Sequence, residues 1–134
     1  MKNRIVIEAI LLVVAFLLGF VPQYVAARHL QNELRVARQE DAKAELRDLA
    51  ALAYVQANQK NYGLASGTSA KFFSRARELA DQTTEAASKG ALADLLSLRE
   101  KVTTDVAAGN PAVMSDLDNL FTRTRRATGS HPEQ

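Results

Sequence analysis

Side chains that could carry chemistry are few in this chain of 134 residues, which has no Cys, no Trp and two His. These counts exclude thiolate chemistry, disulfide bonds and the zinc sites that combine Cys with His. His29 and His131 lie near opposite ends of the sequence, so a shared metal site is not expected. The sequence therefore predicts no bound metal and no cofactor.

The most suggestive spacing is GLASGTSAK over residues 63–71. A phosphate-binding loop ends in Gly-Lys followed by Ser or Thr, and a strand precedes it; both features are missing here. Thr68 and Lys71 have the Ser-x-x-Lys spacing but not its nucleophile. Because no nucleophile, base and orienting group can be assembled from these residues, we expect no catalytic residues and no enzyme activity.

Small residues in the same segment suggest a different role. Gly63, Gly67 and Ala70 recur at helical spacing and form a narrow strip. A glycine inside a helix costs about 1 kcal/mol relative to Ala, so a close helix contact should offset the two glycines. The strip is our candidate helix-contact face. Its neighbour is either another helix of this chain, which we favour, or a partner protein.

Charged side chains nearly balance, with 17 Lys and Arg against 15 Asp and Glu. Such a balance does not predict a nucleic-acid-binding surface. The one local concentration is Arg123, Arg125 and Arg126. Guanidinium groups bind phosphate or carboxylate well, but at the end of a helix they also complement its dipole, and we favour this second role.

A long helix is expected from Gln23 to about Asn58, where Gly and Pro are absent and Ala, Leu, Glu, Arg and Gln dominate. Its apolar stripe changes register near Asp41, so a long dimeric coiled coil is not expected. We predict a helical stalk over residues 28–41. The upper part of the helix, with the second stripe, should join a bundle: Ala42, Leu46, Leu49 and Ala53.

Three further helices are predicted from apolar spacing. The first runs from Tyr62 to Ala80, the second carries Leu92 to Val106 with Gly90 near its start, and the third begins at Pro111, capped by Asn110. No segment alternates with a period of two, so strands are not expected. The fold class is all-α: an antiparallel bundle of three to four helices over residues 42–127 and a disordered tail over 128–134. The predicted core includes Leu49, Phe72, Phe73, Leu79, Leu95, Val102, Leu117 and Phe121.

The amino-terminal segment predicts a membrane anchor over residues 1–27. The uninterrupted apolar run from Ala9 to Val21 becomes long enough to span when its flanks over residues 5–27 are included, since a span needs about 20 residues. Cleavage after Ala27, as in a signal peptide, is the alternative. Lipid contacts are expected along this helix, with candidate membrane-contact residues Ala15, Gly19 and Tyr24.

Lys2 and Arg4 precede the apolar run and favour a cytoplasmic position for that flank. We expect a single-pass protein of the inner (cytoplasmic) membrane whose carboxyl-terminal domain is extracytoplasmic. Its predicted role is that of an accessory, scaffold or assembly subunit that acts through protein–protein contacts, with a protein partner of unknown identity, no nucleic acid, and homo-oligomerisation left open. The alternative is an exported sensory or small-ligand-binding module, with a ligand near the aromatic residues Tyr54, Tyr62, Phe72 and Phe73.

Overall fold

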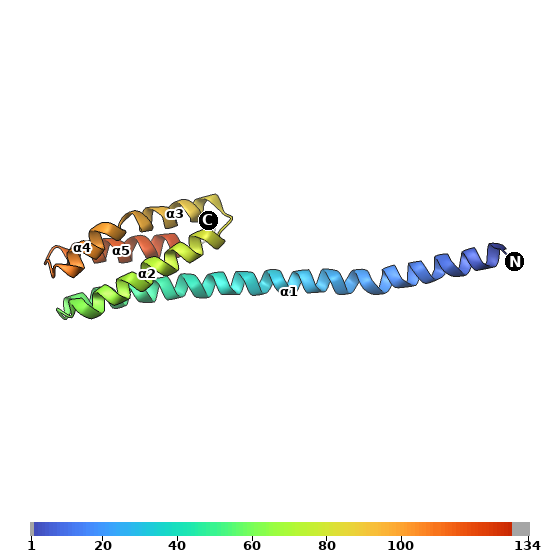
Figure 1. Cartoon of the computed structure of the whole chain (residues 1–134), viewed down its shortest axis with the longest axis horizontal. Helices are drawn as coiled ribbons and strands as arrows, with labels where there is room; N and C mark the ends of the chain where they lie inside the picture. The colour runs from blue at the N-terminus through green and yellow to red at the C-terminus, as the bar shows by residue number, and fades with distance from the viewer. Residues whose placement is uncertain (1, 130–134) are drawn as a thin grey trace. The chain divides into compact units, whose positions relative to one another are not determined.

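The computed structural model describes the backbone of residues 2–129, and the side chains of these residues except 2, 3, 5 and 17–27. This part of the chain contains helices and no strand, which confirms the predicted all-α class. Two compact units divide between Arg38 and Gln39. The helices, coloured along the chain in Figure 1, are α1 (Lys2–Asn58), α2 (Tyr62–Gln82), α3 (Ala86–Ser97), α4 (Arg99–Ala107) and α5 (Val113–Thr128).

The first unit consists of the amino-terminal part of α1, up to Arg38. Among the residues whose side chains are described, no helix contains a stretch long and apolar enough to cross a membrane. The expected anchor over residues 1–27 extends outside those residues. Of its candidate contact residues, Ala15 is exposed on α1, whereas the side chains of Gly19 and Tyr24 lie outside the described part.

The second unit is a helical bundle built from residues 39–58 of α1 together with α2, α3, α4 and α5 (Figure 1). Two side-chain contacts show that α2 runs antiparallel to α1. Arg75 on α2 contacts Glu45 on α1 at 2.8 Å, and the Thr68 hydroxyl donates to Gln56 Oε1 at 2.7 Å. In Figure 1, α3 and α4 follow one another back along α2, and α5 returns beside them.

A single buried cluster holds the bundle together. On α1 it contains Leu46 and three alanines, whose small side chains let the neighbouring helices approach closely. Leu49 and Phe121, both predicted to be in the core, are only partly buried at its edge. The other six predicted members are buried: Phe72, Phe73, Leu79, Leu95, Val102 and Leu117.

Two helices end in the same hydrogen-bond pattern. At the end of α1, the Lys60 amide donates to the Ala57 carbonyl and the Asn61 amide to the Gln56 carbonyl; at the end of α4, Gly109 and Asn110 repeat the pattern. This Schellman motif requires a left-handed residue after the helix. Gly109 (φ +60°) provides it without strain, whereas Lys60 (φ +61°) is a non-glycine residue in the same conformation.

The helix predicted to carry Leu92 to Val106 is divided in two, so the described part of the bundle is built from five helices and not from the three to four that were predicted. The break falls at Leu98, whose amide donates to Leu95 three residues back instead of four. The Ser97 hydroxyl donates to the Asp94 carbonyl and so competes with the backbone for that acceptor. Sequence periodicity missed the break because Leu95 and Val102, on either side of it, remain seven residues apart on one face.

Three predicted boundaries need correction. The helix expected near Gly90 begins earlier, at Ala86. The last helix begins at Val113 and not at Pro111, although Asn110 caps the preceding turn by accepting from the Ala112 amide at 3.0 Å. Thr128 belongs to the segment predicted to be a disordered tail, but it is buried in α5 and its carbonyl accepts a hydrogen bond from Arg47 on α1. Residues 130–134 of the predicted tail lie outside the described part of the chain.

Candidate contact face

The strip of Gly63, Gly67 and Ala70 lies on α2 and is exposed. A Cβ atom built on Gly63 or on Gly67 would meet nothing within 4 Å. The favoured alternative, a close contact with another helix of this chain, is therefore wrong for the described residues. The reason is geometric: the apolar stripe of α2 that contains Phe72 and Ala76 faces the core, which leaves the small residues on the opposite side. Contact with a partner protein remains a prediction.

Exposed aliphatic side chains lie on the same pair of helices as the strip. Leu64 on α2 is 57% exposed, and Leu52 and Val55 on α1 are 47% and 46% exposed. The bond between Thr68 and Gln56 brings α1 and α2 together at this level, so Val55 lies within about one helical turn of Gly67 along the pair. We call the surface formed by these residues the outer face: Leu52, Val55, Gly63, Leu64, Gly67 and Ala70.

Sequence analysis found the strip but missed the three aliphatic residues. The buried stripe of α1 consists of Leu46, Ala50, Ala53 and Ala57. Leu52 and Val55 are aliphatic but do not belong to this stripe, and this pattern could have predicted that they are exposed. Which face of α2 lies beside them depends on the pairing of the two helices, and periodicity within one helix does not contain that information.

The aromatic residues considered as a ligand site are largely core. Phe72 and Phe73 are 0% and 2% exposed, and their rings meet edge to face with centroids 5.1 Å apart. Tyr54 and Tyr62 are partly buried against the same cluster. Tyr62 also lies against the turn after α4, where a Cβ on Gly109 would come 3.4 Å from its ring. These contacts explain the aromatic residues as packing groups.

The remaining titratable candidates are accounted for by pairs on the surface. His29 lies 3.2 Å from Glu33 on the same helix, with both side chains exposed, while His131 lies outside the described residues. Lys101 on α4 joins Asp105 and Asp116 and so links α4 to α5. In the part of the chain that the structure describes, no group of three His, Cys, Asp or Glu residues is placed to hold a metal ion.

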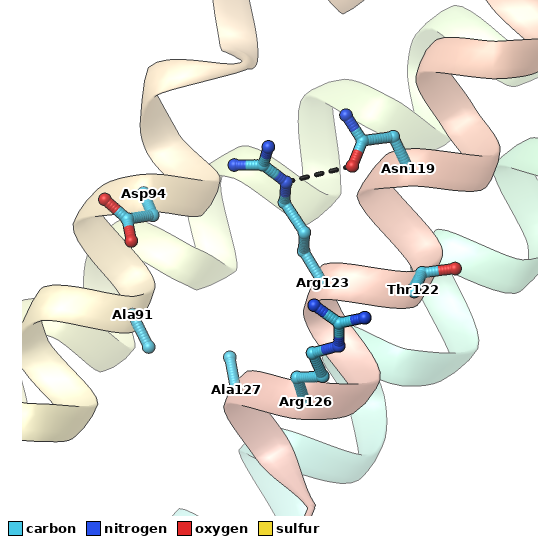
Figure 2. A pocket seen from close by; sticks show the side chains of 7 residues that line it. All are labelled: Ala91, Asp94, Asn119, Thr122, Arg123, Arg126 and Ala127. Carbon is cyan, nitrogen blue, oxygen red and sulfur yellow. Dashed lines mark hydrogen bonds between the residues drawn. The ribbon is translucent and has the colours of Figure 1, made fainter.

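The three arginines of α5 point to different surroundings. The Arg125 guanidinium lies 5.9 Å from the centre of the Phe121 ring, in a cation–π contact. Arg123 and Arg126 instead line a cleft of about 420 Å³ between α3 and α5 (Figure 2). The Arg123 Nε donates to Asn119 Oδ1 at 2.9 Å. Arg125 and Arg126 also occupy the last turn of α5, a position that suits the helix dipole, whereas Arg123, which was predicted with them, lies before that turn.

Comparison with known proteins gives no relative: no protein-family model, no curated protein and no solved structure matches this chain.

Proposed function

We propose that this chain is a membrane-anchored helical adaptor whose bundle binds an α-helix of a partner protein through the outer face. The observation that carries the proposal is the exposure of Leu52, Val55 and Leu64 together with a strip of small residues that has open space above its glycines. Aliphatic side chains flanking small residues form a shallow groove, and a helix can approach the backbone closely in such a groove.

The cost of the glycines supports this role. Gly67 lies inside α2, where Ala would stabilise the helix by about 1 kcal/mol, and the fold leaves the space above Gly67 open. Nothing in the described bundle therefore requires a glycine at this position. A partner helix whose backbone approaches Gly67 closely would use the space left by the missing Cβ. The same helix would bury the exposed aliphatic side chains.

The edges of the outer face indicate the chemistry of the partner. Asp48 on α1 and Lys71 on α2 are exposed, and neither makes an ion pair with a described residue. A partner helix that suits this surface has an aliphatic ridge to lie over Gly67 and charged residues of opposite sign to meet Asp48 and Lys71. Such pairs at the rim contribute specificity more than affinity.

Membrane attachment is proposed from the sequence of residues 5–27. This segment carries one acidic residue, Glu8, near one end, where a long side chain can reach the interface. We place the preceding Lys2 and Arg4 on the cytoplasmic side and the bundle on the other side. Attachment raises the effective concentration of the bundle near membrane partners, which allows a small contact surface to be sufficient.

The anchor is tested by fractionating the membranes of cells that produce the full chain. We expect the protein to stay in the membrane after alkaline extraction and its intact mass to include residues 5–27. A mature form that begins at Arg28, or release of the whole chain by alkaline washing, would contradict the anchor while leaving the outer face untouched.

The contact face is tested by photo-crosslinking in native membranes with a photoreactive amino acid at Val55. The matched control carries it at Gly90, an exposed position on α3 that also has open space around it. We expect a discrete adduct from position 55, mapped by mass spectrometry to an aliphatic helix of another protein, and none from position 90. An adduct between two copies of this chain, equal adducts at both positions, or no adduct would each contradict the proposal.

A further inference from the structure

The cleft between α3 and α5 contains unpaired charges of both signs. Two alanines, Ala91 on α3 and Ala127 on α5, lie in it, and their small side chains leave room between the helices (Figure 2). Arg123 and Arg126 lie on one side and Asp94 on the other (Figure 2). An adjoining cleft of about 300 Å³ continues past Ala91, Arg126 and Ala127 toward Lys43 and Ser88.

None of these charges is neutralised across the cleft. The Arg126 side chain makes no hydrogen bond or ion pair with any described residue, and Arg123 is held only by the amide oxygen of Asn119. The Asp94 carboxylate makes no ion pair with either arginine, so it lies more than 4.0 Å from their nitrogens. Elsewhere on the bundle, Arg75 and Lys101 each contact two carboxylates. Other surface charges such as Asp48 and Lys71 are also unpaired, but the cleft places unpaired charges of both signs around one cavity.

We propose that this cleft binds a small zwitterion, with its carboxylate on Arg123 and Arg126 and its protonated amine toward Asp94. A bare anion would relieve the repulsion between the two guanidinium groups but would meet the carboxylate of Asp94. A bare cation would face the reverse problem. A molecule with both charges satisfies all three side chains, and a guanidinium offers a carboxylate two parallel hydrogen bonds.

Asn119 and Thr122 add polar groups to the lining. The bond from Arg123 Nε to Asn119 fixes the arginine side chain and leaves its terminal nitrogens available to the ligand. The site uses α3 and α5 and shares no residue with the outer face, so it stands independently of the proposed adaptor role.

The test is a titration of the full ¹⁵N-labelled chain in detergent micelles, followed through the arginine side-chain Nε–Hε resonances. The probes are glycine, γ-aminobutyrate, acetate and inorganic phosphate. Glycine and γ-aminobutyrate differ in the distance between their charges and therefore report the separation that the site accepts. We expect one of these two to give saturable shifts at Arg123 and Arg126, with a dissociation constant in the millimolar range or tighter, and acetate to bind less well.

Three variants define the outcome. Arg126→Gln should weaken zwitterion binding about tenfold, whereas the matched control Arg125→Gln, on the same helix but stacked on Phe121, should not change it. Asp94→Asn should weaken zwitterion binding, because it removes the carboxylate that binds the amine. The same substitution should strengthen acetate binding, because it removes the repulsion between Asp94 and the acetate carboxylate. Equal binding of acetate and the zwitterions, an Asp94→Asn variant with unchanged preference, equal shifts at Arg125, or no saturable shift with any probe would overturn the proposal.

Discussion

The hydroxyl of Ser69 is the one buried side-chain polar atom among the described residues that has no hydrogen-bond partner. Ser69 is 2% exposed, so this group has lost its contact with water without replacement. A buried polar group in that state costs about 1–3 kcal/mol. The other buried hydroxyls have partners: Thr124 and Thr128 each donate to a carbonyl four residues back in α5, and Thr68 donates to Gln56 Oε1.

We expect Ser69→Ala to raise the free energy of unfolding by about 1 kcal/mol, because it removes the unsatisfied hydroxyl and leaves the packing unchanged. Urea unfolding followed by circular dichroism measures the change. Ser74→Ala is the control on the exposed side of the same helix, since it shares the gain in helix propensity but buries nothing. Equal effects of the two substitutions would show that burial of the hydroxyl carries no cost.

The Lys101 cluster gives a prediction about pH. A hydrogen bond shared with Asp116, supported by Lys101 at 3.2 Å, holds the pKa of Asp105 below its usual value of 3.8. A hydrogen bond to Asp116 raises the pKa of Lys101 above 10.5. A lowered carboxyl pKa contributes stability above pH 3.8 that is lost as the pH falls through the folded-state pKa. A raised lysine pKa contributes stability that is fully present below pH 10.5 and is lost as the pH rises through the folded-state pKa of the lysine.

Lys101→Gln should therefore lower the melting temperature between these two pH values, and the difference from the parent chain should shrink as the pH falls below 3.8. Thermal melting across a pH series gives this profile. Lys89→Gln, at an exposed lysine of α3 without an ion pair, should leave the profile of the parent chain unchanged. A Lys101→Gln deficit that stays constant down to the lowest pH would contradict the electrostatic origin.

At the scale of the elements, the turn between α1 and α2 contains an unfavourable backbone conformation that a substitution can relieve. Lys60 occupies a left-handed conformation that costs an L-residue about 1–2 kcal/mol, whereas glycine adopts it freely. Lys60→Gly should raise the free energy of unfolding by about 0.5–1 kcal/mol after the greater freedom of glycine in the unfolded chain is counted. Gln59→Gly, one residue earlier and without a positive φ, should be neutral or destabilising. If both glycine variants behave alike in urea unfolding, the turn geometry is not the cause.

The helices that sequence patterns predicted best are those with a single continuous apolar face and an obvious end signal. Asn110 indicated the turn before α5 because Asn strongly prefers the cap position at the start of a helix. The end of α1 is less visible, since Lys60 has no such preference. The break at Leu98 coincides with a side-chain hydrogen bond from Ser97 to a backbone carbonyl, and spacing alone does not reveal such a bond.

The candidate sites divide in the same way. The strip of Gly63, Gly67 and Ala70 lies within one helix and was predictable, but which way it faces was not, because that depends on which helices pack together. Asp94, Arg123 and Arg126 all line the cleft between α3 and α5. Asp94 is far from the two arginines in the sequence, so no local pattern predicts that they share a cleft. Tertiary pairing is the information that was missing in both cases.

At the scale of the whole bundle, one buried cluster draws residues from α1, α2, α3, α4 and α5. Phe72 is fully buried in this cluster, so removal of its ring should destabilise the entire bundle. Phe72→Ala should lower the free energy of unfolding by about 3–5 kcal/mol, a large share of the 5–15 kcal/mol typical of a domain. Leu64→Ala, on the outer face, should change it by less than about 0.5 kcal/mol. Similar melting of both variants would contradict the core assignment.

The core of the bundle is complete without the outer face, so a change on the outer face can affect association without affecting stability. In the proposed adaptor, a partner helix lies over Gly67. A large side chain at Gly67 has open space in the bundle and should be tolerated there, yet it would occupy the volume that the partner helix needs.

The most direct measurement is the yield of the partner adduct from the photoreactive residue at position 55, compared in native membranes between full chains that carry Gly67→Leu and Gly90→Leu. Both glycines are exposed with nothing within 4 Å of an added Cβ, so both variants should keep the melting temperature of the parent chain within a few degrees. We predict that Gly67→Leu lowers the adduct yield about tenfold while Gly90→Leu leaves it unchanged. An unchanged yield in the folded Gly67→Leu chain would contradict the claim that a partner helix binds the outer face.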